Sequence, residues 1–126
     1  MSHSILIVED NANNRNLFKD ILLFHHYDVT VAEDGLQGVA LARELMPDLI
    51  LMDIQMPTMD GITAGDILKK DPATCDLKII ALTSFAMRGD REKFLAAGFD
   101  GYLSKPVNTR ELPGLVKTWL EGAEQP

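Results

Sequence analysis

Five side chains capable of chemistry follow directly after short apolar runs of the sequence. They provide acidic, hydroxyl and ammonium groups, and the residues are Glu9, Asp10, Asp53, Thr83 and Lys105. In an open parallel sheet, ligands bind beyond the carboxyl ends of the strands, so these side chains would gather at one edge if the apolar runs are strands. The pattern predicts one polar site at that edge.

The acidic members of this set point to a divalent metal. Two or three neighbouring carboxylates repel one another and raise each other's pKa unless a cation lies among them. Hard oxygen ligands suit Mg²⁺, which keeps several waters and often bridges to phosphate, and Mn²⁺ could substitute for it. We therefore expect Glu9, Asp10 and Asp53 to bind a divalent cation.

The complete set is suited to phosphoryl transfer. A carboxylate beside a metal can act as the nucleophile towards a phosphoryl group and form an aspartyl phosphate, while cations and hydroxyl donors offset the charge on the equatorial oxygens. Asp53 is the candidate nucleophile. Lys105 would supply the second cation, and Thr83 would supply the hydroxyl group.

These residues also have ordinary structural interpretations. Acidic residues after a strand often cap the next helix, and Asp10 or Asn11 could do so for the first helix. A single lysine or threonine in such a place is usually part of the solvated surface. Capping requires neither a lysine after the fifth run nor an acidic residue between Met52 and Ile54. Because all of these positions at the ends of the apolar runs carry reactive groups, a shared functional site is favoured over separate structural roles.

The elements that would position these residues can be located by hydrophobic period. Short apolar runs alternate with longer segments of helical period, which is typical of a parallel sheet covered by helices. We expect strands at residues 5–8, 29–32, 49–52, 78–82 and 102–104. The first, third and fourth runs are apolar nearly throughout and are predicted to be buried on both faces, whereas the second alternates and suits an edge.

Each intervening segment carries an apolar stripe that is expected to face the sheet. The stripe residues are Leu17, Phe18, Ile21 and Leu22, then Leu36, Val39 and Ala40, then Ile67 and Leu68, then Met87, Phe94 and Leu95, and finally Leu112, Leu115, Val116, Trp119 and Leu120. The last stripe is the clearest, so the only tryptophan is expected in the core. Asn108, three residues before Glu111, predicts a capping box at the start of the last helix.

Composition narrows the class of protein. The 126 residues are 46% apolar and 25% charged, which is typical of a globular domain. We expect one α/β domain with a core of about residues 4–120 and a tail at 121–126. The net charge of −7 disfavours binding to nucleic acid or to anionic membranes. The lone Cys75 excludes an internal disulfide, and the absence of a signal peptide or bilayer-spanning run predicts a cytoplasmic protein.

Along almost the whole chain, from Ile5 to Leu120, these residues resemble the receiver domain of bacterial two-component response regulators. The motifs that carry the resemblance are residues 6–11, 47–57, 59–61, 81–84 and 101–106. The segment from Thr83 to Asp90 is similar in particular to single-domain cell-cycle regulators of the DivK type and to receivers attached to hybrid histidine kinases.

The resemblance implies a flavodoxin-like (βα)5 fold, a three-layer sandwich around a five-stranded parallel sheet of order 2-1-3-4-5. It implies that Asp53 is the phosphoacceptor, which takes a phosphoryl group from a histidine on a histidine kinase or a histidine phosphotransfer protein. Asp10 and Asp53 would bind Mg²⁺ directly, Glu9 would act largely through water, and the backbone carbonyl of Gln55 would be a further ligand.

The resemblance also implies a conformational switch. Lys105 would hold one phosphoryl oxygen, aimed by a cis peptide bond before Pro106, and Thr83 would move to hydrogen-bond another. Tyr102 would turn inward with Thr83, although a half-buried strand residue without a switching role is the alternative interpretation. The change would reshape a partner-binding face formed by the fourth helix, fifth strand and fifth helix. Such a domain promotes only its own phosphorylation and dephosphorylation and is not otherwise an enzyme.

Other functions remain open on sequence grounds. A phosphohydrolase with an aspartyl nucleophile would place a second acid two residues after the first, where this chain has Gln55. A flavin or nucleotide carrier is disfavoured because Glu9 and Asp10 would repel a phosphate without a metal. Among receivers, the chain could be free-standing or excised from a hybrid histidine kinase or multidomain regulator, and Met1 with the short ending after Trp119 favours the first.

Overall fold

The computed structural model describes residues 3–56, 59–84 and 90–122, without the side chains of residues 90 and 91. Within these residues, one parallel sheet contains β1 (Ser4–Val8), β2 (Asp28–Ala32), β3 (Leu49–Asp53), β4 (Lys78–Thr83) and β5 (Gly101–Ser104). The strand order is β2-β1-β3-β4-β5. This is the flavodoxin-like order that the family resemblance implied.

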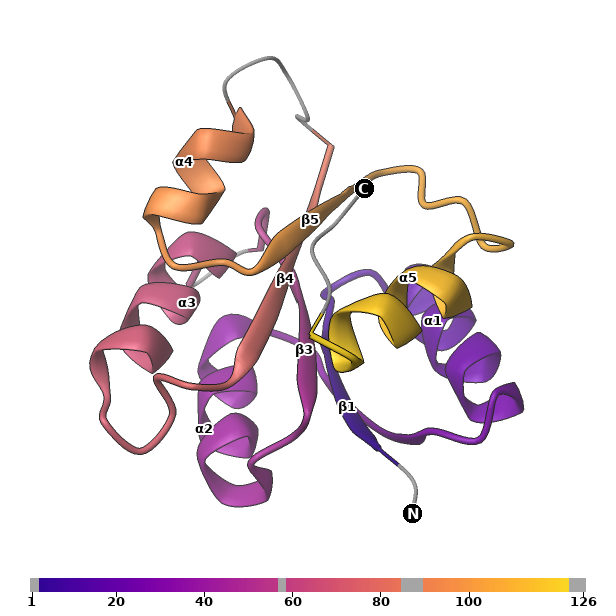
Figure 1. The fold of residues 1–126 in the computed structure, drawn as a ribbon, viewed down its shortest axis with the longest axis horizontal. Helices are drawn as coiled ribbons and strands as arrows, with labels where there is room; N and C mark the ends of the chain where they lie inside the picture. The colour runs from indigo at the N-terminus through magenta and orange to yellow at the C-terminus, as the bar shows by residue number, and fades with distance from the viewer. Residues whose placement is uncertain (1–2, 57–58, 85–89, 123–126) are drawn as a thin grey trace.

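Helices cover both faces of this sheet. They are α1 (Ala12–Phe24), α2 (Gly35–Leu45), α3 (Gly61–Lys70), α4 (Asp90–Ala96) and α5 (Leu112–Leu120). Figure 1 shows α2, α3 and α4 on one side of the sheet and α1 with α5 on the other. The result is the expected three-layer sandwich. Across the described part of the chain, every helix is too short or too polar to span a lipid bilayer.

Two hydrophobic cores fill the spaces between the layers. One lies between the sheet and α2, α3 and α4, and the other lies between the sheet and α1 and α5. The central strands β1, β3 and β4 are almost wholly buried, whereas β2 is partly exposed at an edge, as predicted. Each fully buried aliphatic side chain contributes about 1.5–3 kcal/mol. Trp119 is 2% exposed and belongs to the second core.

The buried face of α2 differs from the prediction. Leu36 and Ala40 are exposed, and the buried residues of α2 include Gly38, Val39 and Ala42. The reason is close packing, because a β-carbon at Gly38 would lie 2.8 Å from a methyl carbon of Val8. The helix therefore approaches the sheet through small residues, which a search for large apolar side chains overlooks.

The predicted stripes are partly wrong in two other helices. In α1 the fully buried residues are Phe18 and Leu22, whereas Leu17 is 46% exposed. In α4 Phe94 is buried but Leu95 is 48% exposed, and Met87 lies outside the described residues. Helices α1 and α4 each contact the sheet along one stripe of residues. An apolar residue next to that stripe in the sequence therefore faces solvent.

Side-chain caps fix where three helices begin. Asn11, Asp34 and Asp60 are the N-cap residues of α1, α2 and α3, and each accepts a hydrogen bond from a backbone amide three residues later. The prediction of a capping box before α5 is wrong. Asn108 Oδ1 instead accepts from the amide of Arg110 at 3.0 Å, in a turn that precedes the helix.

Candidate functional site

Strand register brings the predicted site residues to one edge of the sheet. Glu9 and Asp10 follow β1, and Asp53 and Thr83 are the last residues of β3 and β4. The amide of Glu9 still bonds Ala32 at 3.1 Å, and the amide of Lys105 bonds Thr83 at 2.7 Å. These bonds extend the ladder past the strand ends, so the site residues stand at fixed positions.

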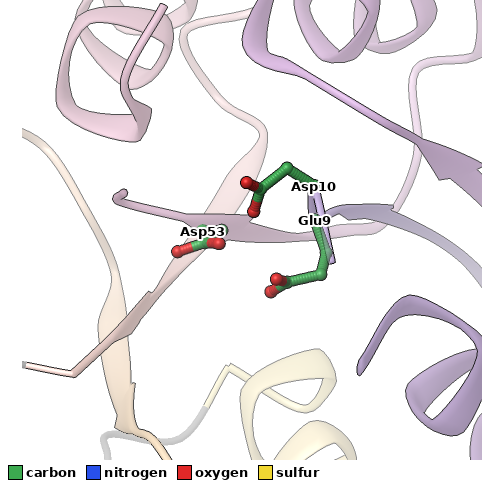
Figure 2. Close-up of side chains that lie close together, drawn as sticks. All are labelled: Glu9, Asp10 and Asp53. Carbon is green, nitrogen blue, oxygen red and sulfur yellow. The ribbon is translucent and has the colours of Figure 1, made fainter. Parts of the chain in front are cut away.

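Three carboxylates gather at this edge, as Figure 2 shows. One oxygen each from Glu9, Asp10 and Asp53 lies within 4.8 Å of the others. Glu9 is 0% exposed and Asp53 is 2% exposed, whereas Asp10 is open to solvent. The arrangement combines two buried acids with one that water can reach.

Lys105 is the cation that the fold places between the two buried acids. Its Nζ donates to Asp53 Oδ2 at 3.0 Å and to Glu9 Oε1 at 3.2 Å. The peptide bond between Lys105 and Pro106 is cis. Burial lowers the pKa of Lys105, but hydrogen bonds and charge from Asp53 and Glu9 together raise that pKa above its usual value. The ammonium group therefore stays charged at neutral pH.

For Glu9, the effect of burial on the pKa outweighs the effect of the neighbouring cation. Burial, followed by the charge of Asp53, raises the pKa of the Glu9 carboxyl to about 7, even though Lys105 acts to lower it. Glu9 Oε2 lies 3.0 Å from Lys105 Nζ in an ion pair, but among the described residues this buried oxygen has no hydrogen-bond partner. One ammonium group does not satisfy the two buried acids.

These observations fit a divalent cation. An unsatisfied buried acceptor costs about 1–3 kcal/mol, which a bound cation would recover. The donor set consists of hard oxygens, as Mg²⁺ prefers. One oxygen from each of three carboxylates lies within 4.8 Å of the others, so a single cation among them would offset their mutual repulsion. The residues present therefore suit Mg²⁺.

Local backbone contacts orient the acidic side chains. The amide of Gln55 donates to Asp53 Oδ1 at 3.1 Å, while the side chain of Gln55 is exposed. The amide of Asn11 donates to Glu9 Oε1 at 3.3 Å. A β-carbon at Gly61 would lie 2.2 Å from the carbonyl oxygen of Asp53, so glycine lets α3 begin directly against the end of β3. Residues 59–61 were named only as part of the family resemblance, and Gly61 was not among the predicted site residues.

The structure also places the two predicted switch residues. Thr83 is 1% exposed at the end of β4, and Tyr102 is half-buried in β5 opposite Ala81. Alternate residues of a strand share a face, so Thr83 and Tyr102 lie on the same side of the sheet. The ring centroid of Tyr102 is 6.2 Å from that of Phe94 in α4. The loop that was predicted to rearrange lies outside the described residues from residue 85 to residue 89.

Comparison with known proteins agrees with this geometry. Residues 5–117 match the family model of the response regulator receiver domain. The chain is 40% identical to the polar-differentiation response regulator DivK of Brucella ovis over 98% of this chain and 100% of that protein. These matches confirm the predicted resemblance.

Solved structures give the same picture. The receiver domain of sensor histidine kinase PA1611 from Pseudomonas aeruginosa, solved with a magnesium ion coordinated in its active-site cleft, has a TM-score of 0.87 and 37% identity, covering 96% of this chain and 99% of that one. The Ssk1 receiver domain of Saccharomyces cerevisiae, crystallised with the histidine phosphotransfer protein Ypd1, has a TM-score of 0.85 and 30% identity, covering 94% of this chain and 88% of that one. The chain thus belongs to the response regulator receiver domain family of two-component signalling.

Proposed function

We propose that this receiver takes a phosphoryl group onto Asp53 from a phosphohistidine of a histidine kinase or a histidine phosphotransfer protein, in a Mg²⁺-dependent reaction. One observation carries the proposal: Lys105 holds one oxygen of the buried Asp53 carboxylate, and the Gln55 amide holds the other. The complex of Ypd1 with the related Ssk1 receiver supports a histidine phosphotransfer protein as the partner.

The chemistry is a single displacement at phosphorus. A carboxylate oxygen of Asp53 forms the new O–P bond while the N–P bond of the donor breaks, and the leaving imidazole nitrogen keeps the electron pair and takes a proton from solvent. Lys105 stays protonated and lies 3.0 Å from Asp53 Oδ2, so its charge can offset the phosphoryl oxygens. Thr83, buried at the end of β4, would donate to another of these oxygens.

The metal would be held by Asp10 and Asp53 directly, by Glu9 largely through water and by the backbone carbonyl of Gln55. Mg²⁺, or Mn²⁺ in its place, supplies positive charge to the phosphoryl oxygens when bound. Asp10 is exposed and can meet a hydrated ion, while the buried Glu9 shares Lys105 with Asp53. These residues would thus orient the ion beside the Asp53 carboxylate.

Phosphorylation would act as a switch. A phosphoryl group adds about −1.5 to −2 charge and three strong acceptor oxygens, so it favours the state in which Thr83 donates to it. Tyr102 shares a face of the sheet with Thr83 and packs against Phe94, so movement of Thr83 would pass to α4 and β5. We propose that a downstream protein recognises the resulting change in the face formed by α4, β5 and α5.

The remaining features complete the proposal. The chain would be a single receiver domain with a core of about residues 4–120, working in the cytoplasm and binding neither nucleic acid nor membrane. It would promote only its own phosphorylation and dephosphorylation. The similar receiver of PA1611 belongs to a sensor histidine kinase, so an origin in such a hybrid protein is the alternative.

The proposal can be tested by intact-protein mass spectrometry. With acetyl phosphate and Mg²⁺, the protein should gain the mass of one phosphoryl group, and EDTA or Asp53→Asn should prevent the gain. Asp76→Asn is the matched control, because the exposed Asp76 precedes β4 at the opposite edge of the sheet. Phosphorylation of the Asp53→Asn variant would contradict the proposal, and repeated hydrolysis of p-nitrophenyl phosphate would favour the phosphohydrolase.

A further inference from the structure

Arg15 of α1 reaches back to the backbone that carries two of the acidic residues. Its Nη1 donates to the carbonyl oxygen of Glu9 at 2.9 Å and to that of Asp10 at 3.4 Å. Its Nη2 lies 3.7 Å from Oε1 of Glu33, which is 71% exposed, whereas the Arg15 side chain is only 14% exposed. The guanidinium group is thus largely shielded where it contacts the loop between β1 and α1.

The position of this cation is unfavourable for the helix itself. The N-terminus of a helix carries partial positive charge and prefers acidic residues, but α1 has none in its first turn. Arg15 lies four residues after the N-cap Asn11, near this end. Its favourable interactions are those with the loop, since a guanidinium group can direct separate N–H bonds to two acceptors.

Asp10 depends on these bonds more than the other acids do. Asp53 and Glu9 are each oriented by Lys105 and by a backbone amide. Within the described part of the chain, the exposed Asp10 carboxylate accepts no hydrogen bond. The position of Asp10 therefore depends on the backbone that carries it, and Arg15 holds the carbonyl groups of that backbone.

We propose that Arg15 is a positioning residue for the metal site. By holding the carbonyl groups of Glu9 and Asp10, it keeps the Asp10 carboxylate close to that of Asp53. This inference rests on the proposed function only in that the three carboxylates bind a divalent cation. Residues that orient metal ligands typically change metal affinity about 10- to 100-fold when removed.

The sign of the effect separates positioning from simple charge. Removing a positive charge near an acidic site strengthens cation binding if only electrostatics matter. Loss of positioning weakens it instead. Arg15→Met keeps most of the aliphatic length and removes every donor, so we expect it to bind Mn²⁺ about 10- to 100-fold more weakly than the wild type.

The experiment titrates the full-length protein with Mn²⁺ alone and measures free Mn²⁺ by electron paramagnetic resonance. Arg43→Met is the matched control, because Arg43 also makes an ion pair, with Asp71 at 3.2 Å, in a different part of the fold. Glu33→Gln removes the exposed partner of Arg15 and leaves both carbonyl contacts, so its Mn²⁺ affinity should stay within about twofold of the wild type. Circular dichroism establishes that each variant is folded, and Arg15→Gln is the second variant if Arg15→Met does not fold.

The outcomes are distinct. Weaker Mn²⁺ binding by a folded Arg15 variant, with Arg43→Met and Glu33→Gln unchanged, supports the inference. Unchanged or tighter binding by the Arg15 variant overturns it, as does an equal loss in Glu33→Gln. The proposed metal site fails separately, and the inference with it, if the wild type binds no Mn²⁺ or if Asp10→Asn binds it equally well.

Discussion

The buried carboxyl of Glu9 makes the stability of this fold depend on pH in a specific direction. Its pKa rises from 4.5 to about 7 on folding, because burial and the charge of Asp53 disfavour ionisation. Between these two values the folded chain binds more protons than the unfolded chain, so the free energy of unfolding falls as pH rises. The contribution of Glu9 is fully present below pH 4.5 and is lost as pH rises to about 7.

Glu9→Gln isolates this contribution because glutamine cannot ionise. With a pKa of 4.5 unfolded and about 7 folded, the cost of ionising Glu9 grows by about 2.5 kcal/mol between pH 5 and pH 8. Water beside the exposed Asp10 screens part of this cost, so we expect about 2 kcal/mol. Relative to the wild type, Glu9→Gln should be more stable at pH 8 than at pH 5 by that amount.

The assay is urea unfolding in EDTA at pH 5 and pH 8, followed by the fluorescence of Trp119, which is 2% exposed when folded. Taking the difference between variant and wild type at each pH removes contributions that the two proteins share, including those of the three histidines. Glu44→Gln makes the same chemical change on the exposed surface of α2 and should show the same difference at both pH values. An equal stability difference for Glu9→Gln at pH 5 and pH 8 would refute the reasoning.

Three further predictions concern the same edge of the sheet. Mg²⁺ at 100 times its dissociation constant should raise the free energy of unfolding at pH 8 by about 2.7 kcal/mol, and Asp10→Asn should lose this gain in a urea titration. Lys105→Met should lower the free energy of unfolding at pH 8 by about 3–5 kcal/mol, because two buried carboxylates lose their shared cation. The loss should be smaller at pH 5, where Glu9 is protonated. Equal losses at the two pH values would contradict the raised pKa of the Glu9 carboxyl. Gly61→Ala should destabilise the fold by about 2–3 kcal/mol, because its β-carbon would lie 2.2 Å from Asp53 O. Gly114 of α5 provides the control, because a β-carbon at this position would have no atom within 4 Å. Gly114→Ala should therefore raise the free energy of unfolding by about 0.5–1 kcal/mol. Similar urea midpoints for the two alanine variants would count against the close approach at Gly61.

The sheet was predictable because its signal is local. Apolar runs and their order in the chain located all five strands, and the edge position of β2 followed from its alternation. The gathering of Glu9, Asp10 and Asp53 followed from the geometry of parallel sheets, since each residue stands at the carboxyl end of a strand. Site residues at the ends of strands can therefore be predicted from the sequence.

Features that depend on contact between elements were not predictable in the same way. The close approach of Gly38 to Val8 requires the distance between α2 and the sheet, which no pattern of large apolar residues contains. Asn108 could cap either a helix or a turn, and the fold uses it in a turn. The bonds from Arg15 to backbone carbonyls depend on the path of the loop, and their one sequence signal is a cation near the start of a helix.

The central claim is that Asp53 is the phosphoacceptor, and chemical mapping tests it most directly. The protein is phosphorylated with phosphoramidate, whose N–P bond resembles that of phosphohistidine, in the presence of Mg²⁺. Borohydride then reduces an acyl phosphate to an alcohol, which converts a phosphorylated aspartate to homoserine, and peptide mass spectrometry locates the product. We predict homoserine at position 53 alone, dependent on Mg²⁺ and absent when EDTA replaces the metal. Homoserine at any other position, or a phosphoryl group that survives hydroxylamine, would contradict the account.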